Sequence, residues 1–172
     1  MKRTNREKDW PFATSLGGAM LMEGDANGWL HLYDVEVLRL ALRKSEIPAR
    51  LLALRPVLRL APFEDELRVK RVLLAERAFW SELDELRVRI FQTHLRPYVS
   101  AVRKASGGRR DLSVAESHAI RLECAGRHLP PLPLRDYGLA RMIANARANV
   151  AVTIGPDVVE WLPAAEGHFY GL

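Results

Sequence analysis

The residues of this chain with the best spacing for chemistry stand at its amino terminus, in the order Lys2, Arg6, Lys8 and Asp9. A lysine and an arginine at this spacing can grip a phosphate through charged hydrogen bonds, and a neighbouring carboxylate can orient one of them. The alternative is a frayed, solvated terminus, which is common at chain ends. If the chain binds a nucleotide or another anion, we expect these four residues to form the binding edge.

These residues lie within the stretch MKRTNREKDWPFATSL, residues 1 to 16. It resembles the segment that follows the catalytic domain in nucleotidyltransferase-like proteins, which include toxins of bacterial toxin-antitoxin and abortive-infection systems. In that family a lysine, an arginine, a further basic residue and an aspartate open the helical carboxy-terminal half. The resemblance implies a helical fold that is related to this half.

The chain departs from that family at the magnesium site. The family's nucleotide-binding part needs a Gly-Gly or Gly-Ser turn followed by paired aspartates on a strand, and no such pair follows Gly17-Gly18. The chain would then be the helical half without its catalytic half. We therefore predict no catalytic residue and no cofactor, and we expect a non-catalytic interaction or accessory module. A nucleotide-binding enzyme or enzyme remnant is the alternative.

A second basic cluster surrounds a glycine pair and contains Arg103, Lys104, Arg109 and Arg110. A loop with four positive charges can meet a phosphate backbone, in contacts that weaken steeply with salt. No aromatic residue is interleaved for base stacking, and Asp111 follows at once. A basic nucleic-acid-binding protein is therefore a second alternative, beside an ordinary solvated loop.

A third group lies on one predicted helix and contains His118, Glu123, Cys124 and His128. Cys124 and His128 are one helical turn apart, so a metal could bridge them. His118 and Glu123 point in different directions around the helix, and a lone cysteine is usually a small buried side chain. Nothing in the sequence orients His128 to activate Cys124 as a nucleophile. We therefore predict no metal site and no thiol chemistry here.

Two further polar groups stand beside apolar residues. The first contains Trp29, His31 and Asp34. We expect Trp29 in the core and a helix that begins near Asp34. The second contains Arg77, Glu82, Asp84 and Glu85. This group could form a functional site only if two of its acids faced inward beside Arg77 in a cleft, and we expect Asp84 to face solvent. We expect Phe79 and Trp80 to lie in the core.

All these candidates would be positioned by helices, above all by one that runs from about Glu64 to Ala105. Its stretch holds no glycine and a single proline, Pro97, at which it could bend. An apolar stripe is spaced four, three and four residues apart, at Phe79, Leu83, Leu86 and Ile90. Acidic residues precede basic ones by four positions at Glu64–Arg68, Glu66–Lys70 and Glu85–Arg89, which suits a helix surface.

Shorter helices should surround it. Asp9 and Pro11 predict a first helix start, and Gly17-Gly18 predicts a close helix contact or a break. Further helices are expected over 112–125, where Ser113 and Glu116 form a capping box, and over 136–150. Beyond residue 151 we expect a short strand pair or an extended tail. The predicted fold is an all-α helical bundle with little or no sheet, in a single domain over 1–172.

Composition bounds the class of protein. The chain has 172 residues, a formal net charge of +5 and one cysteine, so an intrachain disulfide is excluded. No apolar run of signal-peptide type follows the charged residues 1–10, and no apolar stretch approaches the roughly 20 residues that a membrane span needs. We therefore expect a soluble cytoplasmic protein. Because a long amphipathic helix can bury its stripe against a second copy, we also expect a homodimer or a protein partner.

Overall fold

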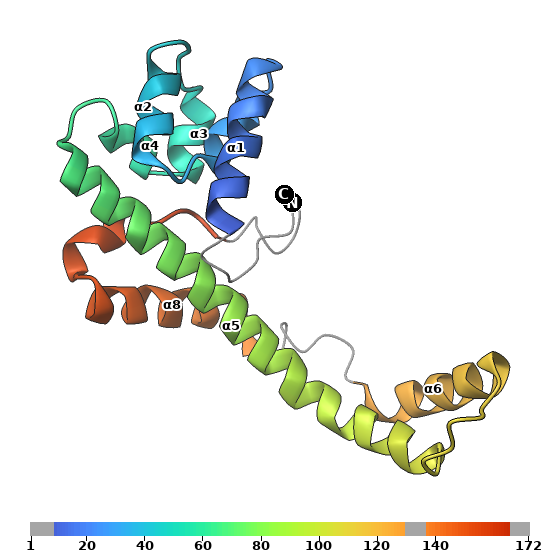
Figure 1. Ribbon diagram of the computed structural model, residues 1–172. Coiled ribbons are helices and arrows are strands. Elements are labelled where there is room, and N and C mark those ends of the chain that lie inside the picture. The colour runs from blue at the N-terminus through green and yellow to red at the C-terminus, as the bar shows by residue number, and fades with distance from the viewer. Residues whose placement is uncertain (1–8, 130–136, 166–172) are drawn as a thin grey trace. The chain divides into compact units, whose positions relative to one another are not determined.

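The computed structural model describes residues 9–129 and 137–165. All secondary structure in these residues is helical and none of them forms a strand, which confirms the predicted all-α fold on one long helix (Figure 1). The chain divides into two compact units, which we call unit 1 (Met1–Asp84 and Met142–Leu172) and unit 2 (Glu85–Arg141). The long helix α5 (Glu66–Ala105) and α8 (Leu139–Thr153) contribute residues to both. The single domain remains a prediction.

Unit 1 contains most of the short helices together with the first half of α5 and most of α8. In chain order the others are α1 (Asp9–Met22), η1 (Ala26–His31), α2 (Val35–Leu42), α3 (Ala49–Leu54), α4 (Val57–Leu60) and η2 (Pro156–Trp161). The core is rich in large side chains, including Trp29, Leu32, Tyr33, Leu38, Leu58, Phe79, Leu83 and Met142. Burial of Trp29, Phe79 and Trp80 confirms the predicted core positions.

Helix starts in unit 1 follow the local sequence. α1 is described from Asp9, and its first turn contains Asp9 and Pro11. α2 is capped by Asp34, whose carboxylate accepts hydrogen bonds from the backbone N–H groups of Glu36 (2.9 Å) and Val37 (3.1 Å). The predicted start near Asp34 is therefore confirmed.

The two glycines of α1 differ in their surroundings. A Cβ on Gly17 would lie 2.8 Å from the carbonyl oxygen of Gly28 in η1, whereas one on Gly18 would meet nothing within 4 Å. The prediction of a close helix contact is therefore confirmed at Gly17, where the absence of a side chain lets α1 approach η1.

α8 lies against the first half of α5. The Asn149 amide donates to the Glu82 carboxylate at 2.9 Å, and the Arg147 guanidinium lies 5.5 Å from the centre of the Phe79 ring. After α8 the predicted strand pair or extended tail is wrong, because the chain forms η2. Pro156 opens η2, where its fixed φ suits a helical turn, and the β-branched residues here have no strand to pair with among the described residues.

Unit 2 is built on the second half of α5, which continues through Pro97 to Ala105. The chain then turns, and α6 (Val114–His128) follows (Figure 1). The predicted capping box at the start of α6 is confirmed, with Ser113 as the cap and Glu116 as its partner. The predicted start of the last helix, Asp136, lies outside the described residues, and α8 is described from Leu139.

Candidate functional site

The predicted anion-binding edge falls mostly outside the described residues. Lys2, Arg6 and Lys8 lie there, and only Asp9 is described, as the half-buried first residue of α1. The edge therefore remains a prediction.

The best-formed polar arrangement in unit 1 is a buried ion pair between Arg55 and Glu76. The Arg55 Nε lies 2.8 Å from Glu76 Oε1 and its Nη2 lies 2.7 Å from Oε2, while Nη1 donates to the Trp29 carbonyl at 2.7 Å. Burial disfavours the charge on Arg55, but the Glu76 carboxylate outweighs this effect, so the pKa of Arg55 lies above its ordinary value. Because all three guanidinium nitrogens and both carboxylate oxygens have partners within unit 1, we interpret the pair as structural.

This pair was not predicted from the sequence, although a signal existed. Glu76 lies four residues after Val72 and three before Phe79, which places a carboxylate on the buried stripe of α5. An acid on such a stripe needs a buried cation. The sequence could therefore have predicted that a partner exists, but not that it is Arg55.

The other acids and bases named on α5 do not converge on a cleft. Arg77 donates to the Tyr33 carbonyl, and Glu82 accepts from Asn149 in α8. The prediction that Asp84 faces solvent is wrong, because this residue is only 8% exposed. It lies one turn beyond the buried Trp80, on a face of α5 that is wider than the predicted stripe.

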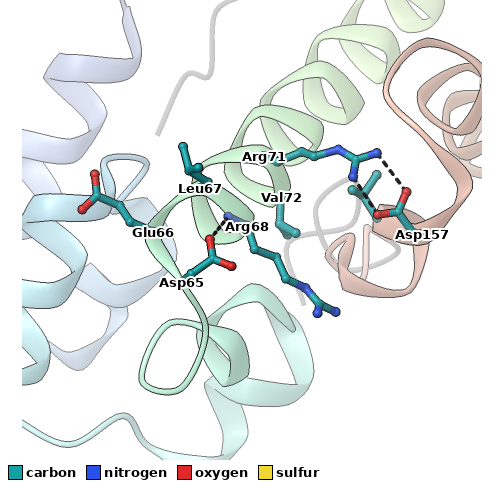
Figure 2. A pocket seen from close by; sticks show the side chains of 8 residues that line it. Asp65, Glu66, Leu67, Arg68, Arg71, Val72 and Asp157 are labelled. Carbon is teal, nitrogen blue, oxygen red and sulfur yellow. Dashed lines mark hydrogen bonds and ion pairs between the residues drawn. The ribbon is translucent and has the colours of Figure 1, made fainter.

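A hollow of about 600 Å³ lies at the start of α5 (Figure 2). Its lining contains Asp65, Glu66, Leu67, Arg68, Arg71, Val72, Asp157 and Val158. The Asp65 carboxylate caps the helix by accepting from the Arg68 N–H at 2.8 Å. Arg71 makes a two-pronged ion pair with Asp157, both N–O distances being 3.0 Å, and also donates to the Ile154 carbonyl at 2.9 Å.

The turn before η2 is shaped around Arg71. Gly155 has a φ of 144°, and a Cβ there would lie 2.5 Å from Arg71 Nη2. Any larger residue would therefore be strained and would collide with the guanidinium. Because Arg71 and Asp157 already pair with each other, and Arg68 lies 3.5 Å from Glu64, we interpret the hollow as the junction between α5 and η2.

The His–Glu–Cys–His group of α6 is not brought together. Cys124 is buried, whereas His118, Glu123 and His128 are exposed. The Glu123 carboxylate pairs with Arg127 at 3.0 Å. Within 9–129 and 137–165, no three His, Cys, Asp or Glu residues are placed so that they could hold a metal ion.

Positive charge is concentrated in unit 2. Its sequence holds eleven Lys and Arg against five Asp and Glu, a net charge of +6, whereas unit 1 holds fifteen against sixteen, a net charge of −1. No acidic residue occurs from residue 86 to residue 110. The overall charge of the chain is therefore a property of one unit, where it can attract an anionic partner.

Three exposed arginines form a line along the second half of α5. We call Arg89, Arg96 and Arg103 the arginine row. They are seven residues apart, which places them on one helix face at intervals of about 10.5 Å, from the rise of 1.5 Å per residue. None of the three makes an ion pair with any residue that the structure describes. From the sequence, Arg103 was predicted as a contact residue and Arg89 as a partner of Glu85, an ion pair that the described residues do not form. Arg96 was not predicted, although the spacing of seven residues was a usable signal.

Apolar side chains lie beside this row. We call Val88, Phe91, Leu95 and Val99 the apolar row, and they are 48%, 37%, 37% and 48% exposed. A depression of about 620 Å³ runs along this face, lined by Gln92, Leu95, Arg96, Val99, Ser100 and Arg103. Unit 2 thus presents a surface on which an exposed apolar strip and a strip of unpaired cations adjoin.

Of the four residues in the predicted basic cluster, Arg109 forms ion pairs with acidic residues. Arg103 and Lys104 are exposed in the last turn of α5, where cations suit the helix dipole, and Arg110 is exposed in the turn. Arg109 instead pairs with Asp111 at 3.4 Å and with Glu116 at 3.7 Å.

No protein-family model, no curated protein and no solved structure matches this chain. In the part of the chain that the structure describes, no helix is both long and apolar enough to cross a membrane. The surface formed by the arginine row and the apolar row is therefore interpreted from its own chemistry.

Proposed function

We propose that this protein is a non-catalytic helical interaction module and that unit 2 binds its partner through the second half of α5. The observation that supports this is that unit 2 has few buried residues and many exposed apolar side chains. Among its described residues only Ile90 and Cys124 are buried, while the whole apolar row is exposed. A small unit with so little core gains stability when a partner covers its apolar surface.

The energies agree with a specific but moderate interaction. Complete burial of a large apolar side chain contributes about 1.5–3 kcal/mol, so covering four half-exposed ones supplies several kcal/mol. Association costs about 4 kcal/mol or more in lost freedom. The apolar row alone barely offsets this cost, and the charges beside it must add to the affinity.

The test is site-specific photocrosslinking in the cells that make the protein. A photoreactive amino acid at Leu95 should give a discrete heavier product. The control position is Leu54 in α3 of unit 1, which is 44% exposed and should give none. Equal crosslinking at both positions, or none at Leu95, would contradict the proposal. A product with the mass of two chains would instead favour the predicted homodimer.

A second candidate function is nucleic-acid binding, which is favoured by the confinement of net positive charge to unit 2. Arg103, Lys104 and Arg110 would contact phosphates, and Arg109 would contribute less because of its acidic partners. A relation to the helical half of nucleotidyltransferase-like proteins, with a nucleotide edge at the amino terminus, also stays a proposal.

A further inference from the structure

We infer that the partner of unit 2 is an acidic amphipathic helix of another chain, which pairs with α5 over residues 88–103 as in a two-stranded coiled coil. This inference rests on the proposed function and specifies the chemistry of the partner. The paired segment would be about 24 Å long, from the rise of 1.5 Å per residue.

The spacing of side chains on this face is that of a coiled coil. The face presents residues alternately four and three positions apart, namely Val88, Gln92, Leu95, Val99 and Val102. In heptad notation Gln92 and Val99 take position a, and the other three take position d. A polar residue at one a position fixes register in coiled coils, and Gln92 is the polar residue here. The depression along α5 is lined by three of these residues, Gln92, Leu95 and Val99, and by two arginines of the arginine row, Arg96 and Arg103.

The arginine row then falls on one set of flanking positions. Arg89, Arg96 and Arg103 all take position e, where charges determine which helix is accepted. The neighbouring g positions hold the aromatic residues Phe91 and Tyr98. A partner with glutamates opposite the arginine row would pair with all three cations.

A second copy of this chain complements the surface less well. In a parallel pair of α5 helices Arg96 and Arg103 would face the aromatic g residues Phe91 and Tyr98, and only Arg89 would face an acid, the buried Asp84. In an antiparallel pair each arginine would face another arginine. Two copies would also bring together two units of charge +6. The charges therefore favour a different, acidic chain.

The apolar row distinguishes a helix from a nucleic acid. Val88, Leu95 and Val99 would find few partners on a phosphate backbone, because protein–nucleic acid interfaces are strongly polar. An amphipathic helix satisfies both rows at once, its apolar face covering one and its glutamates pairing with the other.

The test uses the full chain and two synthetic peptides of three heptads. Both carry leucine at a and d, with one asparagine at a. The first carries glutamate at every e and g position, and the second carries lysine there. We expect the glutamate peptide to bind at least tenfold more tightly than the lysine peptide in fluorescence anisotropy. In the triple variant Arg89→Glu, Arg96→Glu and Arg103→Glu this preference should reverse, so that the lysine peptide rescues binding.

The matched control carries the same change of charge in unit 1, as Arg43→Glu, Lys44→Glu and Arg59→Glu, all at exposed positions. It should keep the preference for glutamate. The variant Leu95→Ser with Val99→Ser should weaken binding of the glutamate peptide at least tenfold, and helicity by circular dichroism verifies that each variant folds.

Three results would overturn the inference. If both peptides bind equally, or if the triple variant still prefers the glutamate peptide, the arginine row does not select an acidic partner. Sedimentation showing a dimer that Leu95→Ser with Val99→Ser dissolves would assign the face to a second copy. Binding of duplex DNA but of neither peptide would assign it to nucleic acid. If Leu95 crosslinks to another protein but the chain does not prefer the glutamate peptide, this inference alone is refuted. If there is neither a crosslink at Leu95 nor a preference for the glutamate peptide, the proposed function is refuted as well.

Discussion

Arg55 and Glu76 form an ion pair whose side chains are only 2% and 1% exposed, with Arg55 Nη2 2.7 Å from Glu76 Oε2. The pair joins the end of α3 to the middle of the buried stripe of α5, and its third contact, to the Trp29 carbonyl, ties in η1. The Tyr33 ring lies 4.6 Å from the guanidinium carbon. One side chain therefore links three separate segments of unit 1 to α5.

Glu76→Leu should destabilise unit 1 by about 3–5 kcal/mol, because it leaves the Arg55 charge buried without its partner. The double variant Arg55→Met with Glu76→Leu removes both charges and should be clearly more stable than Glu76→Leu alone. It still leaves the Trp29 carbonyl without its donor, at a cost of about 1–3 kcal/mol. Urea unfolding measures these differences.

Tryptophan fluorescence is the right probe, since Trp10, Trp29, Trp80 and Trp161 all belong to unit 1. The control Glu160→Gln changes an exposed carboxylate and should leave the midpoint within experimental error. A double variant as unstable as Glu76→Leu would show that the pair adds net stability rather than only avoiding a buried charge.

Gly17→Ala and Gly18→Ala should have opposite effects. Alanine at Gly18 meets nothing and should stabilise α1 by about 0.5–1 kcal/mol. Alanine at Gly17 would press against the Gly28 carbonyl oxygen at 2.8 Å and should cost about 1–3 kcal/mol despite the better helix propensity. Thermal unfolding of the two variants compares them directly, and equal effects would mean that α1 can shift away from η1 without cost.

The parts of the fold that the sequence predicted depend on nearby residues. The cap at Asp34 and the capping box of Ser113 and Glu116 involve partners two or three positions away. The long helix was likewise recognisable from side chains three and four residues apart, and its observed start, Glu66, differs from the predicted one by two residues. Local geometry suffices for such features.

The failed or missing predictions depend on contacts between distant segments. Asp84 is buried because α5 is covered over a wider face than its apolar stripe suggests. Arg55 meets Glu76 across 21 positions, and no local pattern encodes that meeting. The helical turn of η2 replaced a predicted strand because β-branched residues form strands only when another strand lies beside them.

Only part of the candidate surface could be predicted from the sequence. Arg103 was identified because it lies in a basic cluster of the sequence, whereas Arg89 was assigned to an ion pair with Glu85 and Arg96 has no charged neighbour within five residues. Their common spacing of seven places them in line, but only the structure shows that this line is exposed beside the apolar row.

The start of α6 should weaken in acid. Hydrogen bonds from the hydroxyl and the backbone N–H of Ser113, at 2.7 and 2.9 Å, hold the pKa of Glu116 below its ordinary value of 4.5. A lowered pKa in the folded state means that the stabilisation is present above about pH 4.5 and is lost as the pH falls through the folded value. Ser113→Ala should raise the Glu116 midpoint in a carboxyl NMR titration, and Val114→Ala should not.

The amino-terminal edge is tested by thermal shift with ATP, GTP, CTP and UTP, each with magnesium. A nucleotide at about one hundred times its dissociation constant should add some 2.7 kcal/mol of stability. Replacing Lys2, Arg6 and Lys8 by alanine should abolish the shift while leaving duplex binding nearly untouched. Equal loss of both would contradict the separate assignment of the two sites.

If unit 2 binds nucleic acid, its affinity for arbitrary duplex should fall steeply with salt. The logarithm of the affinity changes with the logarithm of the salt concentration by about 0.9 per phosphate contact. Replacing Arg103, Lys104 and Arg110 by alanine should therefore flatten the slope by about 2.7 if each side chain contacts one phosphate. The variant Arg43→Ala, Lys44→Ala and Arg59→Ala removes the same charge from unit 1 and should leave the slope unchanged. Equal flattening in both variants would mean that duplex DNA senses only total charge, and the basic turn would then have no special role.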